Sequence, residues 1–284
     1  MKGGMGLERM QHTIKQEFSY TGIGLHTGQD VTINCYPLSP NQGIVFKRLD
    51  LEGQPEIKAD VDNITSTNRC TTIGDERIDI NTVEHLLSVI NILQIDNLLI
   101  ELNANEPPVT DGSGKVFYEL FIAAGIAEQD VSKEIYQLEE VVYIKEGEQY
   151  LTVLPAEEFK VSYTFVGDHE AINDQFFEYD VSQDDYEQVI APARTFGFAH
   201  EVEKLQKAGL ALGGSLDNAV LVDDDGPINK LRFADEFARH KVLDLIGDMM
   251  LAPPFTGHII AVRSGHTLNA KLAKKLKDKL LGRN

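Results

Sequence analysis

The order of apolar and polar residues along the first half of the chain changes from alternation to a wider spacing. Residues 12–20 and 31–36 alternate, with glycines in the turn between them, which is typical of half-buried β-strands. Residues 81–93 and 116–127 instead place apolar side chains three and four positions apart, as one face of a helix requires. The pattern therefore predicts strands first and helices afterwards.

The second half of the chain repeats this order. Its alternating stretches resemble a hairpin followed by a third strand, at residues 134–145, 149–155 and 159–165. Stretches with helical spacing come next, at residues 201–208, 231–248 and 268–281. The repetition predicts two similarly built α+β domains.

Length and composition agree with this two-domain interpretation. The chain has 284 residues, which suits two domains of about 130–150 residues each. We expect a disordered lead or expression remnant at residues 1–10, a first domain at residues 11–130 and a second at residues 131–284. Apolar residues make up 42% and charged residues 25%, as in ordinary soluble globular proteins.

Charge, cysteine content and hydropathy narrow the classes of partner and compartment. The net charge of −19 argues against nucleic-acid binding, because a duplex repels such a surface. Two cysteines are too few for a disulfide framework and indicate a reducing cytoplasm. No apolar run reaches the roughly 18–20 residues that span a bilayer, and residues 1–10 lack a secretory signal's apolar core. The lysine-rich last helix allows at most a transient contact with a membrane surface.

The stretch 231–248 carries the first candidate chemistry. Glu236, His240, Asp244 and Asp248 follow one another at intervals of four, so they share one side of the predicted helix. His240 and Asp244 can therefore approach one metal ion together. A catalytic zinc site takes three protein ligands and keeps a fourth position open, so a third ligand must come from elsewhere in the chain.

The candidate third ligand is His85, which follows Glu84 at the start of the helix predicted over residues 81–93. An adjacent Glu and His also occur in the H-E-x-x-H metalloproteases, but here the order is reversed and no second His follows four residues later. Two interpretations stay open: a capping acid beside a half-buried histidine, or a general base beside a metal ligand. Two interpretations also stay open for His26, a turn histidine or a residue that lines a site. The same holds for Asp111, which is either a helix cap or a carboxylate that supports a site.

Several motifs in collinear order resemble the zinc-dependent UDP-3-O-acyl-N-acetylglucosamine deacetylases, which commit Gram-negative bacteria to lipid A (lipopolysaccharide) synthesis. The resemblance extends from about His12 to the last helix. The matching motifs are residues 21–28, 82–85, 111–113, 193–198, 212–217, 231–233, 240–248 and 264–266.

The resemblance implies a fold and a passage for a lipid chain. The fold is α+β, with two similar domains that each pack a β-sheet on a pair of helices; the helices are sandwiched between the sheets and the site lies at the domain junction. An insert at about residues 197–224 implies an apolar passage for the 3-O-acyl chain. Its apolar side chains would be Phe198, Leu205, Leu210, Ala211 and Leu212.

The resemblance also implies the metal centre and the base. His85, His240 and Asp244 match the ligands of Zn²⁺, although Fe²⁺ or Co²⁺ also suits such a donor set. Glu84 matches the general base that activates the zinc-bound water.

Four further positions match residues that act on the reacting amide. His266 matches the group that stabilises the oxyanion or protonates the amine, and Asp248 matches the carboxylate that orients it. Lys241 matches a lysine near the oxyanion and the substrate phosphates. Thr195 matches a threonine that hydrogen-bonds the acetyl carbonyl oxygen.

The remaining matches concern substrate binding. Phe196 matches a ring beside the sugar, and His26 and Asp111 match residues that line or support the site. Arg263 stands where many relatives have lysine, and a planar guanidinium does not contact a diphosphate as an ammonium does.

The implied reaction is hydrolysis of the N-acetyl group of UDP-3-O-(3-hydroxyacyl)-N-acetylglucosamine by a cytoplasmic monomer, giving UDP-3-O-(3-hydroxyacyl)-glucosamine and acetate. One alternative is the deacetylase domain of a protein fused to a hydroxyacyl-carrier-protein dehydratase. Others are a metal amidase for another acylated amino sugar and a module that only binds a nucleotide sugar or a lipid. Glu84, Asp248 and His266 argue against mere binding, which needs neither a base nor an acid.

Overall fold

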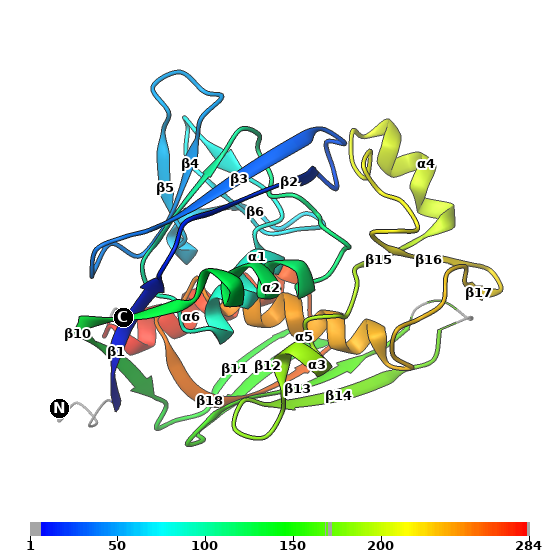
Figure 1. Ribbon diagram of the computed structural model, residues 1–284. Coiled ribbons are helices and arrows are strands. Elements are labelled where there is room, and N and C mark those ends of the chain that lie inside the picture. Colours follow the sequence, from blue (N-terminus) through cyan, green and yellow to red (C-terminus); the bar gives the residue numbers. More distant parts are fainter. Residues whose placement is uncertain (1–6, 168, 170–171, 283–284) are drawn as a thin grey trace.

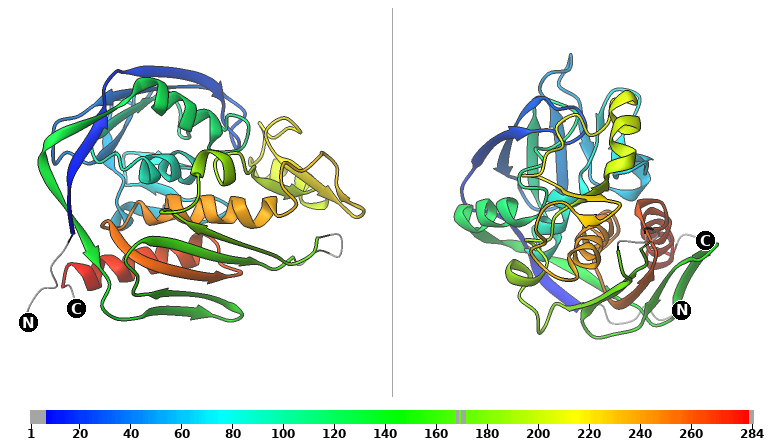
Figure 2. Two further views of the ribbon diagram at one scale, coloured as in Figure 1. Left: turned by 60° about the horizontal axis from the view of Figure 1, so that its bottom comes forward. Right: turned by 90° about the vertical axis from the view of Figure 1, so that its right-hand side faces the viewer.

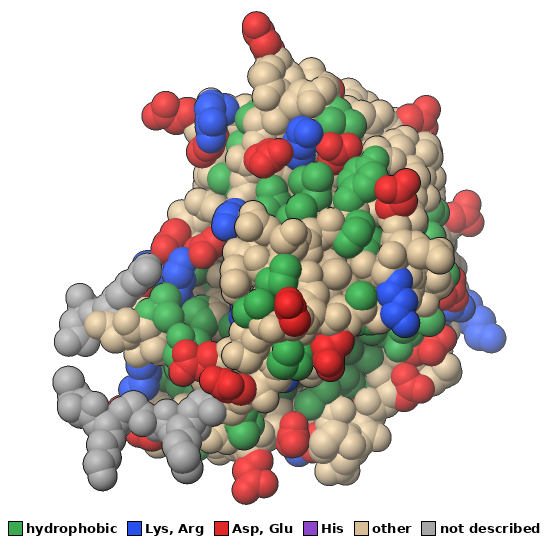
Figure 3. All heavy atoms as spheres, turned by 60° about the vertical axis from the view of Figure 1, so that its left-hand side comes forward, with side chains coloured by type: hydrophobic (Ala, Val, Ile, Leu, Met, Phe, Trp, Pro, Cys, Tyr) green, Lys and Arg blue, Asp and Glu red, His purple; other side chains and the backbone are tan. Residues whose placement is uncertain are grey.

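The computed structural model describes residues 7–167, 169 and 172–282, and it is a mixed α+β structure, which confirms the predicted class. Two large sheets lie on opposite sides of a layer of helices (Figures 1 and 2). Acidic side chains are spread over the face that carries both termini rather than gathered in one patch (Figure 3). Within the described residues, no helix is both long enough and apolar enough to cross a bilayer.

The first large sheet has five strands in the order β2-β3-β9-β4-β5, and only the β4–β9 pair is parallel. Its strands are β2 Phe18–Ile23, β3 Asp30–Pro37, β4 Ile44–Arg48, β5 Glu56–Lys58 and β9 Leu98–Leu102. Helices α1 (Glu84–Ile92) and α2 (Lys115–Ala124) cover its inner face. The Phe18 ring packs edge-on against Phe121 of α2, with centroids 5.0 Å apart.

A small antiparallel sheet precedes α1. It comprises β6 Ile64–Ser66, β7 Thr72–Gly74 and β8 Asp79–Ile80, after the 3-10 helix η1 Val61–Asn63. The amide of Val83 donates to the carbonyl of Thr71 at 3.4 Å, so the start of α1 lies against the residue before β7.

The second large sheet has seven strands. Five of them follow the order β1-β10-β18-β12-β11. The other two branch from β18: β13 pairs with β18, and β14 pairs with β13. Its strands are β1 Leu7–Ile14, β10 Ile126–Gln137, β11 Val142–Glu146, β12 Gln149–Leu154, β13 Phe159–Phe165, β14 Gln175–Asp180 and β18 Phe255–Val262. Residues 7–10, expected in the lead, belong to β1 and pair with β10, and the expected boundary at residue 130 falls inside β10. Residues 1–6 lie outside the described part.

Helices α5 (Glu236–Met249) and α6 (His266–Leu280) cover the inner face of this sheet, and α3 spans Tyr186–Val189. The helix predicted over residues 231–248 begins five residues later, at Glu236. The reason is that the Glu236 carboxylate accepts the Arg232 amide at 2.6 Å and holds the preceding residues as a turn. The insert predicted at about residues 197–224 contains α4 Ala199–Lys207 and β16 Val220–Asp223. It begins within β15 Phe196–Phe198, and β17 Gly226–Pro227 follows it.

The two inner helices α1 and α5 cross at a glycine. A Cβ atom at Gly247 would lie 2.0 Å from the carbonyl oxygen of Glu84, so only glycine permits this approach. The Asn91 side-chain amide adds a hydrogen bond of 2.8 Å to the Ile246 carbonyl. The crossing therefore places the first turn of α1 directly against the polar side of α5.

Candidate active site

A group of three buried donors lies where α1 meets α5. The Nε2 atoms of His85 and His240 lie 3.6 and 3.3 Å from the same oxygen, Oδ1 of Asp244. The two imidazole rings meet edge to face with centroids 4.9 Å apart. The structure therefore brings together the three residues that the sequence predicts as metal ligands, and their donor atoms all lie within 4.8 Å of one another.

The chemistry of these three side chains fits a divalent cation. Asp244 Oδ1 is buried and accepts no hydrogen bond within the described part of the chain, an expensive state for a carboxylate oxygen. Burial lowers the pKa of His85 to about 3 and also lowers the pKa of His240, so both rings are neutral at pH 7. The His240 Nδ1–H donates to the Ala193 carbonyl at 3.1 Å, which leaves the Nε2 lone pair facing Asp244. Two imidazole nitrogens and one carboxylate oxygen suit zinc.

Lys241 occupies the other side of the Asp244 carboxylate. Its Nζ donates to Asp244 Oδ2 at 2.8 Å and lies 5.5 Å from the centre of the Phe196 ring. The Phe196 ring is in turn 6.2 Å from that of His240. A cation and an aromatic ring therefore border the group of donors.

Glu84 is buried at the first position of α1, next to His85. Its Oε2 accepts the Thr71 amide at 3.0 Å, and its Oε1 lies 3.8 Å from His266 Nε2. Burial raises the pKa of the Glu84 carboxyl to about 7, although the positive charge of His266 opposes the shift. A carboxyl group that titrates near neutrality is suited to proton transfer.

His266 is the first residue of α6 and faces Glu84 from the second half of the chain. Its Nδ1 lies 3.0 Å from Asp248 Oδ2. Burial opposes its protonation, but the carboxylates of Asp248 and Glu84 outweigh burial and raise the His266 pKa to about 9. The site therefore pairs an imidazolium with a carboxyl of near-neutral pKa, 3.8 Å apart.

Glu236, the first of the four residues spaced by four in the sequence, is fully buried. It accepts hydrogen bonds from the Arg194 guanidinium at 2.8 Å and from the Arg194 amide at 3.1 Å. Because Ala193 precedes Arg194 and its carbonyl accepts from His240, this ion pair fixes the ring orientation of a candidate ligand. The spacing of four between Glu236 and His240 is visible in the sequence, but the pairing with Arg194 is not.

Three other predicted site residues link the first half of the chain to the insert and its surroundings. His26 Nδ1 accepts the Ala211 amide at 3.3 Å. Asp111 accepts from the Ser113 hydroxyl at 2.7 Å and from Arg232 at 2.8 Å, so it caps a turn and also bridges the two halves. The Thr195 amide donates to the Gly112 carbonyl at 2.7 Å.

The residues predicted for the acyl passage lie in β15, in α4 and in the segment that follows α4. The Phe198 ring stacks on His169 with centroids 5.4 Å apart, Leu205 is half-buried in α4, and the side of Leu212 is open to solvent, with 51% of its surface exposed. Arg263 follows β18 and lies 3.9 Å from Glu148. The structure therefore gathers the predicted metal ligands around α1 and α5, together with Lys241, Asp248 and, from the start of α6, His266. The predicted apolar residues lie in the insert.

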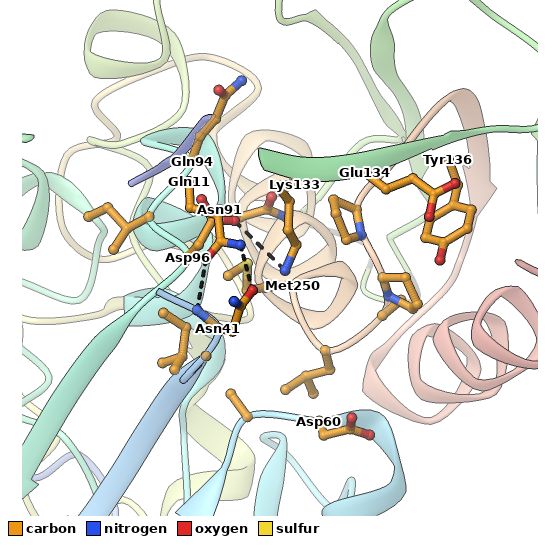
Figure 4. Close-up of a pocket in the computed structure, with 18 of the residues that line it drawn as sticks. Gln11, Asn41, Asp60, Asn91, Gln94, Asp96, Lys133, Glu134, Tyr136 and Met250 are labelled. Carbon is orange, nitrogen blue, oxygen red and sulfur yellow. Dashed lines mark hydrogen bonds and ion pairs between the residues drawn. The ribbon is translucent and has the colours of Figure 1, made fainter. Parts of the chain in front are cut away.

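A separate hollow of about 480 Å³ lies beside the C-terminal ends of α1 and α5 (Figure 4). Three of its charged side chains form ion pairs: Asp96 lies 2.6 Å from Arg9 and 3.9 Å from Lys133. Gln11 donates to Asn41 across it at 2.7 Å. None of the predicted site residues is among the described residues that line it, so this hollow is distinct from the candidate active site.

The donors that fit a metal ion lie beside a carboxyl group and an imidazolium that can exchange protons, an arrangement typical of metal-dependent hydrolases. Residues 11–278 match the family model LpxC, UDP-3-O-acyl N-acetylglycosamine deacetylase. The chain therefore belongs to the UDP-3-O-acyl-N-acetylglucosamine deacetylase family, which confirms the resemblance seen in the sequence.

Individual relatives agree over almost the full length. The UDP-3-O-acyl-N-acetylglucosamine deacetylase of Chlamydia pneumoniae is 42% identical over 279 residues, 96% of this chain and 99% of that protein. The protein of the same name from Myxococcus xanthus is 41% identical over 269 residues, 94% of this chain and 86% of that protein. That from Bdellovibrio bacteriovorus is 39% identical over 272 residues, 95% of this chain and 90% of that protein.

Proposed function

We propose that this chain hydrolyses the N-acetyl group of UDP-3-O-acyl-N-acetylglucosamine to the free amine and acetate, in the biosynthesis of lipid A. Family membership over residues 11–278 supports the substrate. The observation that carries the reaction class is the unpartnered Asp244 oxygen between two neutral imidazoles, beside the pair formed by Glu84 and His266. Such a set combines a cation site with a proton acceptor and a proton donor.

We propose Zn²⁺ as the cation, held by His85, His240 and Asp244, because two imidazoles and one carboxylate are a common donor set of catalytic zinc. Fe²⁺ and Co²⁺ accept the same ligands, and their availability decides between them. When bound, the ion would polarise the amide carbonyl and lower the pKa of water from 15.7 to about 7.

The chain's own residues would move the protons. Glu84, whose pKa of about 7 suits a general base, would take the proton of the attacking water. His266, protonated at neutral pH, would donate Nε2–H to the leaving nitrogen while Asp248 holds its Nδ1–H. Lys241 and Thr195 would stabilise the negative charge on the acetyl oxygen.

The substrate would extend from this centre towards the insert. The Phe196 ring, already beside His240, would contact the sugar. Insert side chains leave apolar surface that the core does not use: α4 contains no buried residue among its nine, all of them described, and Leu212 and Leu216 are about half exposed. Together with Phe198 and Leu205, this surface would receive the acyl chain.

Three residues with polar side chains would border the rest of the substrate. His26 and Asp111, which tie the first half of the chain to the insert and to Arg232, would line and support the site. Arg263 would approach the diphosphate, since a guanidinium binds phosphate oxygens through two parallel hydrogen bonds.

We further propose that residues 11–130 and 131–284 act as two domains whose junction holds the site. Two observations support this division. The five-stranded sheet is formed by residues 18–102 alone, and Glu84 and His266, which face each other, come from different halves of the chain. The enzyme would work in the cytoplasm as a monomer, with at most a transient contact with the inner membrane.

Acetate release from the acylated UDP-sugar, measured with and without a metal chelator, tests this function. We expect turnover that the chelator abolishes, and slower turnover of the same sugar without its 3-O-acyl chain. Turnover that is unaffected by metal removal would contradict the proposal. Equal turnover with and without the acyl chain would instead refute the assignment of the insert.

A further inference from the structure

Thr71, a fully buried threonine just before β7, contacts both candidate proton-transfer groups. Its backbone amide donates to Glu84 Oε2 at 3.0 Å, and its hydroxyl donates to Asp248 Oδ1 at 2.5 Å. The same hydroxyl lies 3.3 Å from His266 Nδ1. Thr71 therefore contacts Glu84, the candidate base from the first half of the chain, and also Asp248 and His266 from the second half.

The hydrogen bonds around Asp248 give the Thr71 hydroxyl a specific task. Asp248 Oδ2 accepts from His266 Nδ1 at 3.0 Å and from the Asn269 side-chain amide at 2.8 Å. The hydroxyl of Thr71 serves the other oxygen, Oδ1, and hydrogen bonds to a carboxylate are stronger than those between neutral groups. With both oxygens held, the carboxylate cannot rotate, so the direction of the His266 ring is fixed.

The backbone around Thr71 is itself held in place. The neighbouring Thr72 hydroxyl donates to the Asn81 side chain at 2.8 Å, and the Val83 amide donates to the Thr71 carbonyl at 3.4 Å. Between Asn81 and Val83, Thr82 has a φ of 54°, an unfavourable value for a β-branched residue. Such a strained backbone persists only where many surrounding contacts hold it, and this is common beside active sites.

We propose that Thr71 is a positioning residue that sets the distance between the proton acceptor Glu84 and the proton donor His266. Its amide holds the Glu84 carboxylate, and its hydroxyl holds Asp248 and, through it, the imidazole. The inference rests on the proposed roles of Glu84 and His266. Thr71 is a functional residue that the sequence reasoning did not single out.

Replacing Thr71 by valine removes the hydroxyl but keeps the shape and the backbone amide. We expect Thr71→Val to lower kcat about 10–100-fold, the usual range for a residue that orients a catalytic group, with KM changed less than about twofold. Thr71→Ser should restore most of kcat. The control is Thr256→Val, which removes a buried hydroxyl that makes no hydrogen bond in the described structure and should leave kcat unchanged. Wild-type kcat in Thr71→Val, or an equal loss in Thr256→Val, would overturn the inference.

A double-mutant cycle separates positioning from a general effect on folding. In a His266→Gln background, Thr71→Val should lower the residual kcat less than about twofold, because the group it orients is already gone. An undiminished loss in that background, or a loss that follows a lower melting temperature, would overturn the role of Thr71. Full activity of His266→Gln itself would instead refute the proposed role of His266, so the two failures are distinguishable.

Discussion

At the residue scale, neighbouring side chains at the start of α1 have different tasks. His85 points its Nε2 at Asp244, whereas Glu84 faces Thr71 and His266. We predict that His85→Ala loses the metal ion, and that Glu84→Gln keeps it but lowers kcat about 10²–10⁴-fold, the usual contribution of a general base. Metal content by atomic spectroscopy and acetate release measure the two effects. Metal loss in both variants would contradict this division.

The pH dependence of turnover is a second residue-scale prediction. His266 must carry a proton to donate one, and its neighbouring carboxylates raise its pKa to about 9. Activity should therefore be retained up to about pH 8 and fall as the pH rises through about 9. The profile of kcat should lose this alkaline decline in His266→Gln. A decline that persists in the variant would assign it to another group.

The Arg194–Glu236 pair makes a prediction about stability. Both side chains are buried, and removing one partner leaves a buried charge uncompensated. We expect Glu236→Ala to lower the free energy of unfolding by about 3–5 kcal/mol. The matched control is Glu203→Ala, which breaks an exposed pair with Lys207 and should change it by less than about 1 kcal/mol. Urea unfolding measures both, and equal losses would contradict a specific role for Glu236.

What the sequence reveals at this scale depends on how far apart the partners lie. Residues spaced by four on one helix, such as His240 and Asp244, are visible as a pattern, and their neighbourhood follows from helix geometry. Partners from distant segments, such as Arg194 for Glu236 or Thr71 for Asp248, have no local signal. They became apparent only when tertiary structure brought the segments together.

At the element scale, the approach of α1 to α5 determines whether the site forms. Gly247 allows the contact, because a Cβ there would lie 2.0 Å from the Glu84 carbonyl oxygen. We predict that Gly247→Ala pushes the helices apart and lowers the melting temperature. It should also lower kcat by a larger factor than it changes KM. Gly197→Ala, whose Cβ would meet no atom within 4 Å, is the control for stability. A Gly247→Ala protein with unchanged stability and activity would contradict this account.

Predicted elements were correct in kind and less accurate at their ends. The helices predicted over residues 81–93 and 268–281 appear as α1 and α6, since their apolar spacing reflects burial on one side, but α1 begins three residues later, at Glu84. Residues 12–20 alternate as one strand in the sequence, but the structure divides them into β1 and β2 around Lys15, whose amide bonds to Gly125. Such ends are set by long-range hydrogen bonds that a local pattern does not contain.

At the scale of the whole molecule, the candidate metal ligands come from segments that are far apart in the chain. His85 comes from α1 and His240 and Asp244 from α5, so an ion held by them would link the two halves. Predicting this link from sequence depended on the family resemblance, because no spacing connects residue 85 with residue 240. A ligand that binds only the folded state stabilises it, so metal removal should lower the melting temperature of the wild type. The melting temperature of His85→Ala should not respond to a chelator.

The most direct test of the central claim is a zinc titration of metal-free protein, followed by acetate release from the acylated UDP-sugar. The account predicts negligible turnover without metal and a linear rise that ends at about one zinc ion per chain, the stoichiometry of a single three-ligand site. Full turnover of the metal-free protein, or turnover that never responds to added zinc or another divalent ion, would contradict it.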